Sequence, residues 1–310
     1  MRHTARRTRD PTQENPPAQH TALVPYARLP REHHGHTVLT STVDVLGTAH
    51  WLLTERPPQP GGELPPGELP PFDASVVSVH PDGTTSVTAL AGVRARRPHL
   101  DRLPHGGFLV AASRTHRTTA GEQVQLFDAV GRETSSFSVG DAVEHLLVDG
   151  AGRIWFGHFD ENPLGIRRWS TTGALVWSSD GADIPGLFDC YALNVTGTTA
   201  WACTYTDFPL VEIRGDGHDR RVRVWSNGVD GARAVAVHGE RVAFYGGYTG
   251  HRDRLALGEL TESTVERTDT GLLTLPDGLP PRRRRVVARG ARIHVQAEPY
   301  TEWGVFDLGA

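Results

Sequence analysis

Two kinds of β-strand landmark alternate along the chain at a period of about 45 residues, and this repeat constrains the fold more than any other feature. The first landmark is a short apolar strand that begins at Trp51, Phe108, Trp155, Trp201, Val242 and Ile293. The second is a strand that runs into a turn, and it begins at Val76, Val124, Ile166, Leu210, Leu255 and Trp303. With 34 Gly, 22 Pro and no sustained helical periodicity, the pattern indicates an all-β chain.

Each period accommodates four short strands, which we call a, b, c and d. In the best-defined stretch, residues 124–159, they read VQLFDA (c), ETSSFSV (d), AVEHLLVD (a) and RIWFGHF (b). Four antiparallel strands at this period are typical of one blade of a β-propeller, and the repeats predict a six-bladed β-propeller. Because each blade buries its faces on its neighbours, the ring is expected to close.

The two ends of the chain are expected to complete one blade together. The last strand, Trp303 to Leu308, is of the c type without a d partner, and the first β run, Thr37 to Val45, is a d-plus-a segment without a c strand. Their pairing would hide two sheet edges that otherwise invite aggregation. Residues 1–20 are expected to form a disordered Arg- and Pro-rich tail, followed by a propeller over residues 21–310.

Composition excludes several classes of function. All 32 Lys+Arg residues are arginine, which excludes mechanisms that use a lysine amine. A net charge of −4 argues against nucleic acid as the main partner, and no apolar run approaches the ~20 residues of a membrane helix. No apolar segment follows the charged N-terminus, so a cytoplasmic location is expected. Cys190 and Cys203 are expected to be free thiols, because they are diagonal neighbours in a hairpin, about 7 Å apart.

The stretch from Asp149 to Gly157, DGAGRIWFG, resembles the Asp-x-x-Gly-x-Ile-Trp-x-Gly unit of two-component-regulator propeller repeats. It is also similar to senescence-marker/gluconolactonase and NHL propellers, and DCYALNV and YTDFPLVEI resemble segments of uncharacterised bacterial propellers. These resemblances imply a propeller fold. The gluconolactonase resemblance also implies a divalent metal held by a Glu, an Asn and an Asp near the channel. The chain departs from that pattern, because Arg233 and Ala234 stand where the family has Asn-Gly, and no Ser-Pro-Asp-Gly follows.

Strand order decides which loops share a face of the predicted ring. The a–b and c–d turns are short and lie on one side, whereas the b–c and d–a loops are longer, polar and lie on the other side, where we expect function. An acidic arc on that face comprises Asp141, Glu144, His145, His158, Asp160, Glu161, Asn162, Asp183, Asp189 and Asp207. A basic arc comprises Arg94, Arg96, Arg97, Arg102, Arg282, Arg283, Arg284 and Arg285. The alternative is that these charges only cover a solvated rim.

The acidic arc predicts a cation site, because oxygen ligands from adjacent blades suit Ca²⁺ or Mg²⁺. The candidate metal ligands are Asp160, Glu161, Asp189 and Asp207. The candidate ligand-binding residues are His145, His158, Asp160, Glu161, Asp189, Tyr205, Asp207, Tyr248, Arg233 and Arg284. His145 is the candidate base, since histidine titrates near neutrality. Aromatic residues near the same face, which suit sugars and flat organic molecules, are Phe159, Tyr205, Phe208, Tyr245, Tyr248 and Tyr300.

Three functions stay open on the sequence alone. The first is a non-catalytic binding or sensor module that holds a small polar molecule, or a protein partner, at the channel mouth. The second is a metal-dependent (Ca, Mg or Zn) hydrolase or lactonase-like enzyme that uses the acidic arc, although the chain has no linear catalytic motif. The third is a protein-interaction scaffold that uses the Pro-rich loop of residues 55–73, where Gly-Glu-Leu-Pro-Pro occurs twice in tandem.

Overall fold

The computed structural model describes residues 19–57, 70–115, 122–160, 164–179, 188–215, 221–248 and 250–310. Within these ranges the chain forms 25 strands, and a short 3-10 turn, η1, spans Arg31–His33. No helix in these ranges has the length and apolar character needed to cross a membrane. The predicted all-β class is therefore confirmed.

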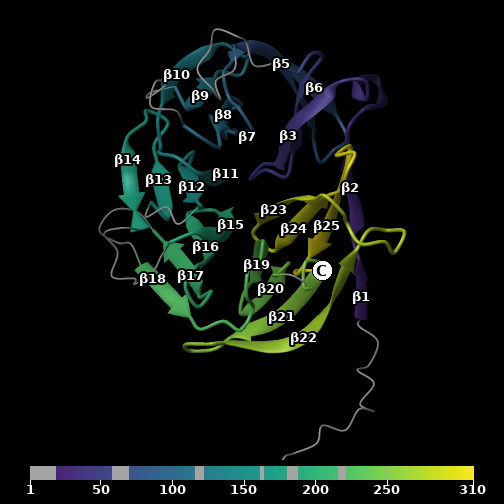
Figure 1. Cartoon of the computed structure of the whole chain (residues 1–310), viewed down its shortest axis with the longest axis vertical. Coiled ribbons are helices and arrows are strands. Elements are labelled where there is room, and N and C mark those ends of the chain that lie inside the picture. The colour runs from purple at the N-terminus through teal and green to yellow at the C-terminus, as the bar shows by residue number, and fades with distance from the viewer. Residues whose placement is uncertain are drawn as a thin grey trace, which may run out of the picture.

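The strands pair antiparallel in runs of four (Figure 1). The first three runs are β3 (Thr37–Val43), β4 (Ala49–Thr54), β5 (Phe72–Val79) and β6 (Thr85–Val93); β7 (Pro98–Arg102), β8 (Phe108–Ala112), β9 (Val124–Phe127) and β10 (Glu133–Phe137); and β11 (Val143–Val148), β12 (Ile154–His158), β13 (Ile166–Trp169) and β14 (Leu175–Ser178). The next two are β15 (Cys190–Thr196), β16 (Thr199–Thr204), β17 (Leu210–Arg214) and β18 (Arg221–Trp225); and β19 (Ala234–His238), β20 (Arg241–Tyr245), β21 (Arg254–Leu260) and β22 (Val265–Thr274). The last contains β23 (Arg285–Arg289), β24 (Arg292–Gln296) and β25 (Glu302–Asp307).

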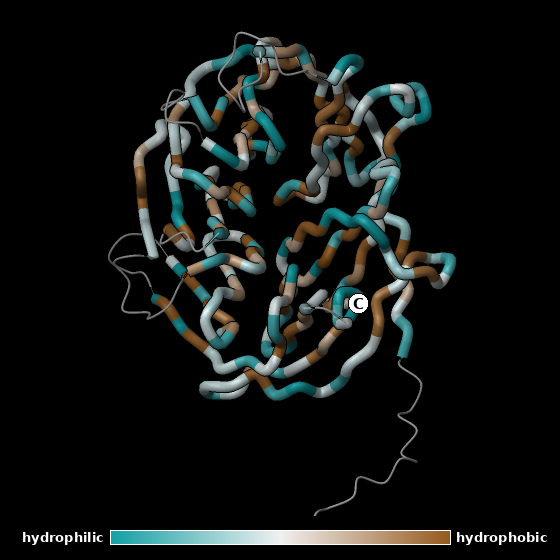
Figure 2. Tube along the Cα trace, viewed as in Figure 1, coloured by the Kyte–Doolittle hydropathy of each residue, from teal (hydrophilic) through white to brown (hydrophobic). Residues whose placement is uncertain are grey.

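These units stand around a common axis, with the first strand of each unit nearest the axis (Figure 1). This is the β-propeller arrangement that the sequence predicts, and every landmark run lies in the second or third strand of a unit. Hydrophobic residues recur along the strands of every unit around the axis (Figure 2). The buried ones pack between neighbouring units: Trp155 of β12, for example, shares a cluster with Leu193 of β15 and Ile213 of β17.

Aspartates build the tight turns that follow two of the inner strands, Asp44 after β3 and Asp149 after β11. Asp149 accepts hydrogen bonds from the amides of Ala151 and Arg153, both at 2.9 Å, and from the indole nitrogen of Trp155 at 3.0 Å. Gly152, with φ +80°, occupies the left-handed position that this turn requires. The DGAGRIWFG motif is thus explained by turn geometry, and the side chains that define it serve the fold.

The N-terminal segment differs from expectation. The outer strand that pairs with β25 is β2 (Val24–Arg28), whereas Thr37–Val43 is the inner strand of the next unit only. Before β2, β1 (Gln19–Ala22) pairs in parallel with β22, so Gln19 and His20 are strand residues. The predicted d-plus-a segment at Thr37 to Val45 is therefore wrong in its d part. Pro25 argues against a strand at this position, because proline is tolerated in a strand only at a sheet edge, and β2 is such an edge strand.

The cysteine prediction is confirmed. Ala192 of β15 lies opposite Cys203 of β16, so Cys190 is the diagonal neighbour of Cys203. Both thiols are free and buried. Burial raises the pKa of the Cys203 thiol to about 12, which keeps it protonated and unreactive near neutral pH.

A buried arginine joins four units at one end of the axis. Arg289, the last residue of β23, donates to the carbonyl oxygens of Val43 in β3 and Val148 in β11, both at 2.9 Å. Its guanidinium also forms an ion pair with the buried Asp101 of β7 at 2.5 Å. Burial raises the pKa of the Asp101 carboxyl, and Arg289 and the Val148 amide, 2.6 Å away, oppose that shift.

Hydrogen bonds of Asn194 connect the two remaining inner strands, β15 and β19, to the residue that follows Arg289. Asn194 of β15 is fully buried, and its amide nitrogen donates to the carbonyl oxygens of Val235 in β19 and Gly290 after β23, both at 2.8 Å. Its amide oxygen accepts from the Gly290 amide at 2.7 Å. The inner strands therefore end in one hydrogen-bonded network, which fills the axis at the side of the a–b turns.

We predict that Arg289→Met lowers the free energy of unfolding by about 3–5 kcal/mol, because it leaves the Asp101 carboxyl buried without its cation. The matched control is Arg292→Met in the adjoining strand. Arg292 pairs with Asp307 at the surface, with half of its side chain exposed, so its loss costs about 1 kcal/mol or less. Urea unfolding measures both, and equal losses would contradict the role given to Arg289.

Candidate ligand-binding site

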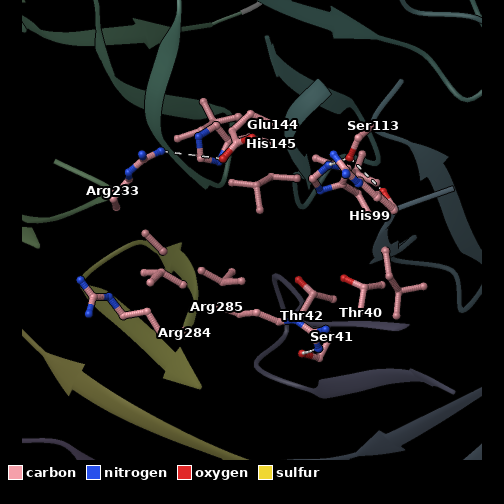
Figure 3. Close-up of a pocket in the computed structure, with 18 of the residues that line it drawn as sticks. Thr40, Ser41, Thr42, His99, Ser113, Glu144, His145, Arg233, Arg284 and Arg285 are labelled. Atoms are coloured by element: carbon pink, nitrogen blue, oxygen red, sulfur yellow. Dashed lines mark hydrogen bonds and ion pairs between the residues drawn. The ribbon is translucent and has the colours of Figure 1, made fainter. Parts of the chain in front are cut away.

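A cavity of about 780 Å³ opens on the axis at the face of the b–c and d–a loops (Figure 3). Its wall is built by β3, β7, β11, β15 and β23 and by the loops that lead into or out of them. The lining side chains that carry charge or can carry it are Arg97, His99, Glu144, His145, Arg233, Arg252, Arg283, Arg284 and Arg285. Among the described lining residues, arginine thus greatly outnumbers the single carboxylate, Glu144.

Two of these arginines are held firmly by the fold. Arg285 donates to the Ser41 hydroxyl and to the Leu39 carbonyl, both at 3.1 Å, and its guanidinium lies 4.1 Å from the ring centre of Tyr300. Burial lowers the pKa of Arg285 to about 10, so it stays charged at neutral pH. Arg284 forms an ion pair with Asp253 and donates to a nearby backbone carbonyl at 2.8 Å. Arg285 therefore supplies fixed positive charge at the cavity wall, whereas Asp253 compensates the charge of Arg284 (Figure 3).

Other arginines keep donors available. The guanidinium groups of Arg97 and Arg252 make no hydrogen bond or ion pair to a described residue, and both side chains are exposed at the opening. Arg233 faces Glu144 at 3.9 Å, which is a loose pair between half-exposed side chains (Figure 3). These three residues can reorient toward a ligand without breaking the fold.

Both histidines of the wall are neutral. The Nε2 atom of His145 lies 3.1 Å from the Cys190 carbonyl, which can only accept, so Nε2 carries the proton. Burial, followed by the charge of Arg233, lowers the pKa of His145 to about 4. Burial also lowers the pKa of His99. His145 does lie at the cavity, as predicted, but its pKa is too low for an efficient general base at neutral pH.

His99 and Ser113 lie together in the wall but do not form a nucleophile and its base. Nε2 of His99 is 3.0 Å from the Val143 carbonyl and 2.9 Å from the Ser113 hydroxyl oxygen. The carbonyl requires a proton on Nε2, and the Ser113 hydroxyl donates to the Arg97 carbonyl at 2.9 Å. His99 therefore cannot take a proton from Ser113 in this arrangement.

An aromatic cluster adjoins the cavity at β15. Tyr191 lines the cavity, and its ring centre lies 5.3 Å from those of Phe159 and Phe208, 5.9 Å from that of Tyr248 and 6.3 Å from that of Tyr205. Sequence reasoning named the four outer residues of this cluster but missed Tyr191, its centre. It also missed His99 and Arg252. The position of these residues could have indicated the cavity wall, since Tyr191, His99 and His145 all lie near the start of an inner strand.

Most of the described acidic arc does not line the cavity. Asp160 and Asp141 share Arg114 as an ion-pair partner, and His158 is buried with Nδ1 2.9 Å from the Asp141 carbonyl. Asp189 is buried and Asp207 is exposed, and neither lines the cavity. Glu161, Asn162 and Asp183 lie outside the described residues. Of the acidic arc, only Glu144 and His145 belong to the described cavity wall.

In the described ranges, no three His, Cys, Asp or Glu side chains are grouped so that they could hold a metal ion. Asp160, Asp189 and Asp207 therefore do not form such a set among themselves, and the fourth candidate ligand is Glu161. The Ca²⁺ or Mg²⁺ site, and the hydrolase that would depend on it, stay predictions. Most of the Pro-rich loop, residues 58–69, also lies outside the described residues.

Backbone strain gathers on the face that carries the cavity. Among the described residues, those other than glycine with positive φ are Arg97, Ala142, Asp160, Asp207, Phe208, Arg283 and Tyr300. All of them lie in b–c or d–a loops, and the opposite face has none. Such conformations cost of order 1–3 kcal/mol each and cluster at functional sites. Their placement coincides with the face on which the sequence predicts the function.

No family model matches the chain, and no curated protein matches it in sequence. Among solved structures, it is similar to virginiamycin B lyase from Staphylococcus aureus, with a TM-score of 0.48, 11% identity, and coverage of 91% of this chain and 98% of that one. A nidogen/laminin complex gives a TM-score of 0.48 at 10% identity, covering 77% of this chain and 81% of that chain. AztD from Citrobacter koseri gives a TM-score of 0.45 at 11% identity, covering 87% of this chain and 83% of that chain. Similarities at these scores and identities establish no shared activity or ligand.

Proposed function

We propose that this protein is a closed six-bladed β-propeller that binds a small organic anion, without catalysis, at the mouth of its central channel. The observation that carries the binding proposal is the cavity wall, in which several arginines face one carboxylate. Positive charges at a concave, partly apolar wall focus their field on an anionic ligand. Guanidinium groups also match carboxylate and phosphate geometry bidentately.

Closure is supported by contacts between successive inner strands. β3 contacts β7, β7 contacts β11, and the series continues through β15, β19 and β23 back to β3. The last contact includes the hydrogen bonds of Arg285 to Ser41 and Leu39. At the outer edge, β2 pairs with β25, and the Leu29 amide donates to the Thr301 carbonyl at 2.8 Å.

Non-catalytic binding is supported by the state of the polar groups at the cavity. Both wall histidines donate to backbone carbonyls through Nε2, and the Ser113 hydroxyl donates to another carbonyl. Among the groups that remain available, the guanidiniums of Arg97, Arg233 and Arg252 hold charge but do not exchange protons near neutral pH, and the Glu144 carboxylate faces Arg233.

We predict that Leu29→Ala lowers the free energy of unfolding by about 2–5 kcal/mol, because Leu29 packs with Trp51 and Trp303 where the chain ends meet. Leu29 is 1% exposed, and the nearby Val24 of β2 is 62% exposed, so Val24→Ala is the control and changes stability by about 0.5 kcal/mol or less. Denaturant unfolding measures both. A Leu29→Ala protein as stable as the wild type would mean that this junction does not hold the ring.

We predict that phenyl phosphate binds at the cavity and that benzylammonium, which has the same ring and the opposite charge, does not. Replacing Arg252 by Gln should weaken phenyl phosphate binding about tenfold, since a hydrogen bond to a charged group contributes about 1.5–3 kcal/mol. Arg132→Gln is the control, because it removes the same charge from a turn on the opposite face. Isothermal titration measures the affinities. Binding of both probes, or of neither, would overturn the proposal.

We predict that benzenesulfonate binding is independent of pH between 6 and 8. The charge of this ligand is constant in that range, and His145, with a pKa of about 4, stays neutral throughout it. The arginines stay charged as well. If affinity instead rises as the pH falls through 6.5, a histidine cation takes part in binding, and the assignment of the charge to arginine alone is wrong.

A further inference from the structure

The aromatic cluster and the arginine-lined cavity are parts of one continuous surface. Tyr191 belongs to both, because its side chain lines the cavity and contacts every other ring of the cluster. Arg233 joins them a second time, since its guanidinium lies 5.6 Å from the ring centre of Tyr191 and 6.0 Å from that of Phe159. A ligand bound at the arginines is therefore within reach of the rings.

Two rings of the cluster offer open surface. Tyr205 is 43% exposed and Tyr248 is 44% exposed. Phe208 lies between them, with ring centres 5.6 Å from that of Tyr205 and 5.4 Å from that of Tyr248, both edge to face. Large aromatic side chains exposed together on a loop face are uncommon on a soluble protein without a binding role.

Tyr248 is held in place before any ligand arrives. Its hydroxyl donates to the Tyr191 hydroxyl at 2.9 Å. Gly231, with φ +65°, packs so closely against the ring that a Cβ at that position would lie 3.2 Å from it. A fixed platform loses little conformational entropy on binding, which favours affinity.

The charge around these rings excludes one class of ligand that aromatic clusters often bind. An organic cation suits an aromatic cage, but here the guanidinium of Arg233 already lies against two of the rings, and further arginines line the adjoining cavity. A second cation would be repelled. A planar ring with a negative group satisfies both parts of the surface.

We propose that the ligand is an aromatic anion, whose carboxylate or phosphate group binds the arginines while its planar ring packs on Tyr205 and Tyr248. The inference rests on the proposed function, because it assumes that the cavity takes an anion. It adds the chemical class of the rest of the ligand and assigns Tyr205 and Tyr248 as the residues that determine specificity for it.

The test compares phenyl phosphate with cyclohexyl phosphate, which carry the same anionic group on a flat and on a puckered ring. Isothermal titration of the wild type should give about tenfold tighter binding of phenyl phosphate, since aromatic pairs gain energy beyond area burial. In the Tyr205→Leu/Tyr248→Leu double variant, the two affinities should become equal through a loss for phenyl phosphate alone. The Tyr205→Phe/Tyr248→Phe variant keeps both rings and should keep the preference.

The outcomes separate this inference from the function on which it rests. If both phosphates bind the wild type equally and both depend on Arg252, the anion site stands and the aromatic specificity is overturned. If the Leu double variant keeps the preference, the platform lies elsewhere and the assignment of Tyr205 and Tyr248 is overturned. If neither phosphate binds, the proposed function fails, and this inference fails with it. The melting temperature of each variant checks that it stays folded, because both rings also pack on Phe208.

Discussion

The buried guanidinium of Arg289 is the constraint on which the rest of the structure depends. A charged group without partners is far too costly to bury, so folding must bring Asp101, Val43 and Val148 to it at the same time. Those residues belong to three different sheets. Their convergence places the inner strands around one axis, and Asn194 ties in the remaining two beside them. One polar network thus sets the position of every inner strand at this end.

Because this network fills one end of the axis, the cavity opens toward the other. The inner strands begin at that open end, where Glu144, His145 and Tyr191 reach the cavity wall. Arg233 reaches toward Glu144, and Arg284 and Arg285 lie across the cavity from them (Figure 3). The rigid turns lie on the closed side, as the Asp149 turn shows, and the strained loop residues lie on the open side. Under the proposed function, stability and binding are therefore separated between the two ends of the same strands.

The chemistry of the open end favours recognition over reaction. Burial keeps the wall histidines neutral, and backbone carbonyls fix their Nε2 protons. Arginine, which cannot act as an acid or base near neutral pH, supplies the charge. The aromatic cluster around Tyr191 supplies apolar surface next to that charge. Under the proposed function, such a wall selects a ligand by its charge and shape.

The sequence by itself determined the strand repeat, the all-β class, the loop face and the free thiols, because strand periodicity, turn residues and hairpin register are local properties. Only the tertiary structure decided which charges meet. Arg233 and Arg284 do lie at the cavity, as predicted. Asp160, however, forms an ion pair with Arg114, which is distant in the sequence. Tyr191 is the centre of an aromatic cluster whose members come from three units. Strand β2 could not be predicted from the sequence either, since only its pairing with β25, at the other end of the chain, makes it a strand. Such contacts depend on how the units pack around the axis, which brings together residues that no local pattern relates.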